Sequence, residues 1–150
     1  MSLWFFIFVS EYFQQMQKTI FTSTSKREEL SDITALVKQV VEEAAIATGV
    51  AAVYVQGATA GIMIQENWDE SVQNDVVMML RKIAPPGIWE HDRQDGNGDS
   101  HMKAGLVGPS ETIPIIDGKL GLSTWQNIFL CEFDGPRTER RILVTILATD

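Results

Sequence analysis

The chain has 150 residues, which is the length of one domain with a sizeable hydrophobic core. Twelve Lys and Arg stand against 20 Asp and Glu, which gives a formal net charge of −8 and a field that would repel a nucleic-acid backbone. We therefore expect no nucleic-acid partner.

The first ten residues are strongly apolar but lack the pattern of a targeting signal. The apolar run is too short to span a bilayer, no basic residue precedes it, and no small-x-small cleavage pattern follows it. The single cysteine, Cys131, lies in an apolar run and favours a buried thiol in a reducing compartment. These features predict a cytoplasmic protein that does not associate with membranes. We interpret residues 1–16 as an N-terminal extension, or a misassigned start, and residues 17–150 as the domain.

The first half of the domain shows one strand and then a helix. Alternating apolar and polar side chains predict a strand over residues 17–24. Apolar side chains at helical spacing predict an amphipathic helix over 33–44, for which Ser31 and Asp32 are candidate N-caps and Gly49 is a stop signal.

Two strands and a second helix follow. The strands are predicted over 51–56 and 60–65, with the small residues 57–59 between them. Asp69 can cap a helix with a second apolar stripe, and Pro85-Pro86 would end it.

The C-terminal third has the pattern of a β-meander. Asp117-Gly118 is a two-residue hairpin signal between strands over 110–116 and 119–126, the second of which is predicted to continue to residue 133. A further turn precedes a last strand over 139–147. Two helices with a β-meander or mixed sheet predict an α+β fold in one domain.

Both histidines of the chain, His91 and His101, lie in one glycine-rich stretch with three aspartates and Asn97. Imidazole can ligate a metal or transfer a proton near neutral pH, and nearby carboxylates assist either role. The stretch is therefore a candidate site. The alternative is a solvated acidic turn, because Asp, Asn and Gly are also common turn residues.

Four motifs follow one another along the chain: Gly57 to Asn67, His91 to His101, Ser123 to Gln126, and Glu132 to Arg137. In this order they resemble the motifs of the YjbQ family, known as secondary thiamine-phosphate synthase, and the resemblance runs from about Lys18 to Leu147. The resemblance implies a compact α+β domain, a homotrimer with sites near the subunit boundaries, and a weak thiamine-phosphate synthase activity.

The resemblance also indicates site residues. It places candidate catalytic roles on Glu66, His91 and His101, and candidate substrate contacts on Asn67, Asn97, Trp125 and Gln126. Two nearby cations, Lys103 and Arg137, could bind an anionic substrate such as a small phosphorylated molecule.

Each of these positions also has a structural interpretation. Glu66 could cap the second helix, and Trp125 could belong to a core or a subunit interface. Arg137 could simply pair with Glu132 or Asp134, which we favour slightly, and Lys103 could be a surface lysine.

One departure from the family affects the predicted metal site. Most members carry a histidine where this chain has Gly57, so a three-histidine site cannot be complete here. A divalent metal, zinc or magnesium, would have to use His91, His101 and a carboxylate such as Glu66 or Asp99.

Three functions remain open at this point. The first is an enzyme that condenses a pyrimidine diphosphate with a thiazole phosphate. The second is a metal-assisted hydrolase of a small phosphorylated metabolite. The third is a trimeric ligand-binding protein without catalytic activity.

Overall fold

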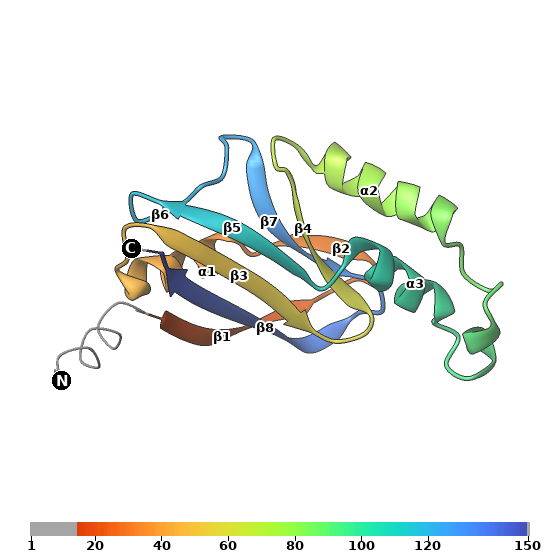
Figure 1. Cartoon of the computed structure of the whole chain (residues 1–150). Coiled ribbons are helices and arrows are strands. Elements are labelled where there is room, and N and C mark those ends of the chain that lie inside the picture. The colour runs from red at the N-terminus through yellow and green to blue at the C-terminus, as the bar shows by residue number, and fades with distance from the viewer. Residues whose placement is uncertain (1–14, 150) are drawn as a thin grey trace, which may run out of the picture.

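Two curled antiparallel sheets form the framework of the fold in the computed structural model, which describes residues 15–149 (Figure 1). The larger sheet has the strand order β1 (Gln15–Thr24), β8 (Arg137–Ala148), β3 (Gly49–Gln56), β5 (Ser110–Ile116) and β6 (Lys119–Leu120). The smaller sheet has the order β2 (Glu29–Asp32), β7 (Gln126–Glu132) and β4 (Ala60–Glu66). The helices are α1 (Thr34–Ala44), α2 (Glu70–Ile83) and α3 (Gly98–Val107), with a 3₁₀ turn η1 (Glu90–Arg93) before α3.

The main core lies between the two sheets and α1. Side chains alternate across each strand, so Val and Ile at every second position of β3 and β8 point to the same face. That face is buried against α1 and the smaller sheet, with Val53, Ile142 and Val144 fully enclosed. The apolar periodicity of the sequence therefore accounts for this core.

A smaller apolar cluster holds α2 and α3 against the smaller sheet. Its buried members are Val76 and Leu80 of α2, Ala104 of α3, Cys131 of β7, and Phe133. Burial raises the pKa of the Cys131 thiol to about 12, so this thiol is un-ionised at neutral pH. The prediction of a buried cysteine is confirmed.

The helices predicted over 33–44 and after Asp69 are both present. The Asp69 side chain accepts a hydrogen bond from the backbone N–H of Ser71 (2.8 Å) and caps α2 as predicted. At the start of α1 the N-cap is Ile33 rather than Ser31 or Asp32, although Asp32 accepts from the N–H of Thr34 (2.9 Å). Helix α1 ends at Ala45, which takes a left-handed conformation, whereas Gly49 begins β3.

The prediction of a β-meander is wrong. The hairpin at Asp117-Gly118 exists, with φ values of 50° and 72° that suit a two-residue turn. Its second strand, β6, ends at Leu120, and the chain then crosses to the smaller sheet, where β7 lies between β2 and β4. The last strand, β8, returns to the larger sheet between β1 and β3.

The prediction of only two helices is also wrong, because the glycine-rich stretch contains α3. Its buried face carries Asp99, Ser100 and Lys103, with Ala104 as its one buried apolar side chain, so no apolar stripe marks it as a helix.

The first strand begins before the predicted domain boundary at residue 17. Gln15 and Met16 belong to β1 and lie opposite Leu147 and Ile146 of β8. The rest of the predicted extension, residues 1–14, lies outside the described residues. Among the helices that the structure describes, none is long and apolar enough to cross a membrane.

We expect Leu80→Ala to destabilise the fold far more than Met79→Ala. Leu80 is 2% exposed in the small cluster, so its truncation should lower the free energy of unfolding by roughly 2–5 kcal/mol. The neighbouring Met79 is 48% exposed and should change it by less than about 0.5 kcal/mol. Urea denaturation of both variants measures the difference, and equal effects would show that α2 does not dock through Leu80.

Candidate functional site

The predicted site residues lie in two groups at opposite ends of β4. The histidine group, which contains His91 and His101, lies at the start of β4, where Ala60 and His101 line the same cavity. The tryptophan group, which contains Trp68 and Trp125, lies at the end of β4, beside Glu66. Six residue steps at ~3.3 Å each separate Ala60 from Glu66, or roughly 20 Å. Within one chain the two groups are therefore too far apart to contact the same small molecule.

His91 and His101 are brought together by η1 and α3. Their ring centroids lie 4.8 Å apart with the ring planes at 90°, an edge-to-face contact. His91 is exposed and lies 3.7 Å from the Asp95 carboxylate, while His101 is half-buried. The two imidazole rings thus lie side by side, with the His91 ring accessible to solvent and the His101 ring partly enclosed.

The Asp92 carboxylate fixes the turn that carries His91 to the start of α3. It accepts hydrogen bonds from the backbone N–H of Trp89 (2.9 Å) and of Gly98 (2.8 Å). The Trp89 hydrogen bond, with that of Gly98, holds the pKa of Asp92 below its usual value and outweighs the opposing effect of partial desolvation. The Trp89 indole donates in turn to the Pro85 carbonyl (2.7 Å).

Asp99 and Lys103, one turn apart on α3, belong to a buried ionic cluster rather than to an open site. The Lys103 ammonium contacts Asp99 (2.7 Å) and Glu28 (2.5 Å), and its side chain is 1% exposed. Arg27 pairs with Asp99 (2.8 Å), and Arg81 pairs with Glu28. The position of Lys103 therefore does not support the predicted substrate contact, and Lys103 is not a surface lysine. The Asp99 carboxylate is similarly taken up by two cations.

A cavity of about 210 Å³ lies beside His101, between α3 and the connection from β3 to β4. Its walls also include Gly57, Gly105 and Pro109. Gly57 has φ of 149°, and a Cβ placed there would lie 2.9 Å from Arg140 Nη1. A histidine at position 57 would therefore strain the backbone and displace Arg140, although Gly57 and His101 do share a cavity.

Asn97 and Arg137 meet at Asp134. Asn97 Nδ2 donates to Asp134 Oδ2 (3.1 Å), and Arg137 Nη2 donates to the same oxygen (2.6 Å). The pairing of Arg137 with a carboxylate agrees with the interpretation that we favoured. Asn97 Oδ1 is buried with no hydrogen-bond donor in the described part of the chain, a cost of roughly 1–3 kcal/mol that a bound water or ligand would relieve.

The tryptophan group forms an open hollow of about 300 Å³ lined by Glu66, Trp68 and Trp125. The two indole rings contact edge to face at 4.9 Å, and the residues are 69% and 52% exposed. Trp68 was not predicted as a site residue, although it directly follows the Glu66-Asn67 motif. Such exposure of large aromatic rings is typical of a binding or association surface.

Asn67 and Gln126 make structural contacts in this group. Asn67 Nδ2 donates to Asp32 Oδ2 (3.0 Å), which also accepts from Asn127 Nδ2 (2.7 Å). Gln126 Oε1 accepts from the N–H of Ser123 (2.9 Å) and so shapes the turn before β7. Both side-chain amides therefore stabilise the segments next to Glu66, where β4 ends and β7 begins.

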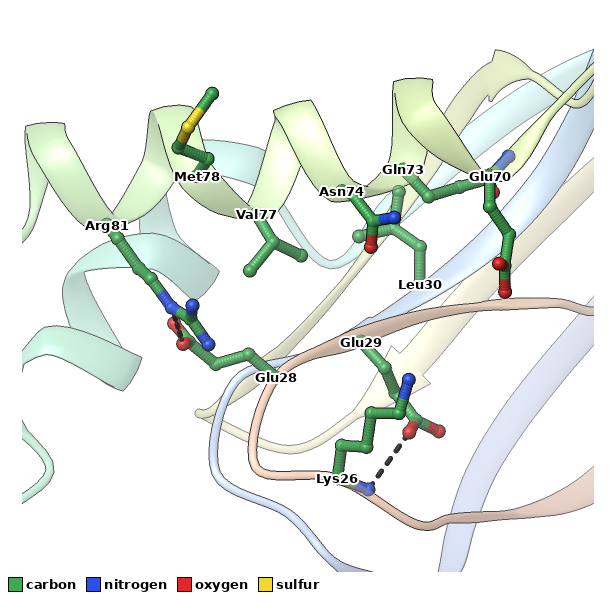
Figure 2. Close-up of a pocket in the computed structure, with 10 residues that line it drawn as sticks. All are labelled: Lys26, Glu28, Glu29, Leu30, Glu70, Gln73, Asn74, Val77, Met78 and Arg81. Atoms are coloured by element: carbon green, nitrogen blue, oxygen red, sulfur yellow. Dashed lines mark hydrogen bonds and ion pairs between the residues drawn. The ribbon is translucent and has the colours of Figure 1, made fainter.

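Sequence reasoning missed a third hollow, a polar pocket of about 300 Å³ between α2 and the segment that leads into β2 (Figure 2). Figure 2 shows Arg81 of α2 reaching Glu28, with Glu29 and Lys26 below them. Burial raises the pKa of Glu29, but hydrogen bonds from Ser25, Ser31 and Lys26 outweigh this and hold the pKa below its usual value. Arg81 is thus paired with Glu28, and the Glu29 carboxylate is held by neighbouring hydroxyl and backbone N–H groups.

The donor groups present do not fit the predicted metal set. Among residues 15–149, no three His, Cys, Asp or Glu side chains are grouped so that they could hold a metal ion. The two imidazoles have Asp95 nearby only on the His91 side, and Asp99 is held by Arg27 and Lys103. We therefore derive no chemical step from a metal held by these residues.

By its fold and site, the chain is a small α+β protein with two antiparallel sheets and a histidine pair beside a cavity. Residues 18–149 match the family model described as "UPF0047 protein YjbQ-like", and the chain belongs to this family. The predicted membership of the YjbQ family is thereby confirmed.

Relatives in archaea and bacteria share most of the chain. A UPF0047 protein of Methanocaldococcus jannaschii is 47% identical over 83% of this chain and 88% of its own length. The UPF0047 protein YugU of Bacillus subtilis is 42% identical over 82% of this chain and 93% of its own length. The crystal structure of a protein of unknown function from Sulfolobus solfataricus superposes with a TM-score of 0.88 at 36% identity and covers 91% of this chain and 99% of that one.

We expect Lys103→Met to destabilise the protein by roughly 3 kcal/mol, because it leaves two buried carboxylates with one cation fewer. The matched control is Lys38→Met on α1, where the lysine side chain is 63% exposed and the change should be below about 0.5 kcal/mol. Chemical denaturation at neutral pH compares the two. A Lys103 variant as stable as the Lys38 variant would contradict a structural role for the ionic cluster.

Proposed function

We propose that the protein binds a small phosphorylated substrate beside His91 and His101 and condenses a pyrimidine diphosphate with a thiazole phosphate. The observation that carries this proposal is the contact of the two imidazoles, whose ring centroids lie 4.8 Å apart, with His101 lining a cavity of about 210 Å³. The reaction itself comes from the family resemblance of the motifs that contain these residues. The names of the archaeal relatives assign no activity.

The proposed reaction exchanges one bond for another. The bond between the pyrimidine methylene carbon and the diphosphate oxygen breaks, and the diphosphate leaves with the electron pair. The thiazole nitrogen then forms a bond to that carbon with its lone pair and becomes a thiazolium. Positioning of the nitrogen and stabilisation of the departing charge are the main demands on the site.

The histidine pair can meet the second demand. A protonated imidazole donates a hydrogen bond to the leaving diphosphate, and the edge-to-face contact keeps the other ring beside it. The hydrolase hypothesis instead needs a metal-bound water, for which the described residues group no set of three ligands.

We predict that His101→Ala lowers thiamine phosphate formation about 10²- to 10⁴-fold, the range for loss of one acid or base group. His91→Ala should have a similar but smaller effect, because His91 is more exposed. The assay uses both substrates with and without magnesium, beside metal analysis of the purified protein.

The control for this assay is Met102→Ala, next to His101 on α3 and 45% exposed, which should retain parental activity and melting temperature. Full activity in both histidine variants would contradict the site. Absence of product with the parent protein would contradict the reaction.

We also propose that the protein assembles as a homotrimer with its sites near subunit boundaries, as the family resemblance implies. The apolar segment from Trp125 to Phe133 is not an open sheet edge that would need a partner subunit, because β7 is paired on both sides within the chain. A different surface supports assembly. Helix α1 packs on one side of the larger sheet, and the opposite, outer face of that sheet exposes Phe21 (54%), Tyr54 (45%) and Leu147 (37%).

Light scattering at micromolar concentration should report three times the mass of one chain, and Tyr54→Glu should shift the protein toward monomers. The charge-changing control is Lys38→Glu on the exposed side of α1, which should leave the mass unchanged. A monomeric parent protein would remove the trimer proposal, and an unaffected Tyr54 variant would exclude this face as the interface.

A further inference from the structure

Arg140 has one guanidinium nitrogen that the fold leaves unused. Nε and Nη2 donate to the two oxygens of Glu132 (2.8 and 2.6 Å), and Nη2 also donates to Thr59 Oγ1 (3.0 Å). Nη1 donates to no acceptor among the hydrogen bonds of the described residues, although the Arg140 side chain is only 9% exposed. A guanidinium is always charged at neutral pH, and its free N–H groups favour an anionic acceptor.

The position of Gly57 keeps Nη1 uncovered. A Cβ at residue 57 would lie 2.9 Å from Nη1, and the only other heavy atom that it would approach within 4 Å is the guanidinium carbon. Any side chain at this position would therefore cover the nitrogen. Because Gly57 forms part of the cavity wall with His101, Nη1 lies next to a wall position that has no side chain to cover it.

We propose that this cavity is a subsite for a phosphate group, bound between Arg140 Nη1 and the His101 imidazole. Phosphate oxygens accept hydrogen bonds from both kinds of donor, and the arginine is held rigidly by Glu132 and Thr59 before the ligand arrives. The subsite deepens the proposed function, since it names the chemical group that the histidine site recognises.

The size of the cavity sets what it can hold. Its volume of about 210 Å³ is smaller than the roughly 300–1,000 Å³ of a pocket for a whole metabolite. The cavity therefore accommodates a phosphate and a few attached atoms, and the remainder of the substrate extends past His101 toward His91. The net charge of −8 does not prevent this, because exposed charges beyond about 8–10 Å are screened at physiological ionic strength.

Gly105 of α3 offers a test that leaves the arginine in place. It lines the same cavity, and a Cβ added there would meet no heavy atom within 4 Å. Gly105→Leu therefore adds bulk at the cavity wall from a Cβ position that is open, in a helix where leucine is favoured over glycine. Met102→Leu is the control, because Met102 is exposed on the same helix and is not part of the cavity wall.

The experiment titrates the full-length protein with inorganic phosphate, and in a parallel arm with acetate, while NMR follows the arginine side-chain N–H signals. The Arg140 signals are assigned by their loss in Arg140→Lys. We expect saturable phosphate binding with a shift of the Arg140 signals, at least tenfold weaker binding by Gly105→Leu, and parental binding by Met102→Leu. Melting temperatures identify any variant that is not folded.

Three results would overturn the inference. These are non-saturable phosphate binding by the parent protein, equal phosphate affinity in a folded Gly105→Leu variant, and acetate binding as tight as that of phosphate. The titration measures binding and not turnover, so its outcome is independent of the activity assay. Phosphate binding by a protein that forms no thiamine phosphate would overturn the proposed reaction and leave the subsite standing. Unchanged product formation by the Gly105→Leu variant would overturn the subsite and leave the proposed reaction standing.

Discussion

The buried ion pair of Glu132 and Arg140 is the contact on which the two-sheet arrangement depends. Glu132 ends β7 in the smaller sheet and Arg140 lies in β8 of the larger one. The fully buried carboxylate accepts two hydrogen bonds from Arg140, one from Thr24 of β1, and two from the following backbone N–H groups. Burial of a carboxylate is costly unless all its acceptor positions are used, so this pair demands one specific placement of the sheets.

The histidine site follows from that placement. The connection from β3 to β4 crosses between the sheets next to the ion pair, and Thr59 is tied to it by Arg140. Helix α3 then docks over the start of β4 with a buried face that carries Asp99 and Lys103 beside Ala104. Lys103 and Asp99 can occupy that face only because Glu28 and Arg27 arrive from the segment before β2. The ion pairs of Arg27 and Glu28 with α3 thus help to fix the position of the helix that carries His101.

The arrangement at the two ends of β4 limits how the chain can work. A pair of imidazoles with a small cavity lies at one end, and two exposed indoles with Glu66 lie at the other, roughly 20 Å away. A single chain would use these groups separately. Assembly of several chains would allow the groups of one subunit to approach those of another, which is the physical reason to consider function and oligomeric state together.

The sequence by itself determined the features that depend on neighbouring residues. Alternation gave the strands, Asp69 gave the start of α2, and Asp117-Gly118 gave the hairpin, because period, caps and turns are local. The order of motifs also gave the family. Tertiary structure alone decided that β7 leaves the predicted meander, since pairing partners depend on long-range contacts. It alone decided that Lys103 is buried and that Glu66 lies far from His101. The stretch around His101 was interpreted as a loop because its polar side chains carry no apolar period, and only the countercharges of residues some 70 positions earlier make that polar face suitable for burial.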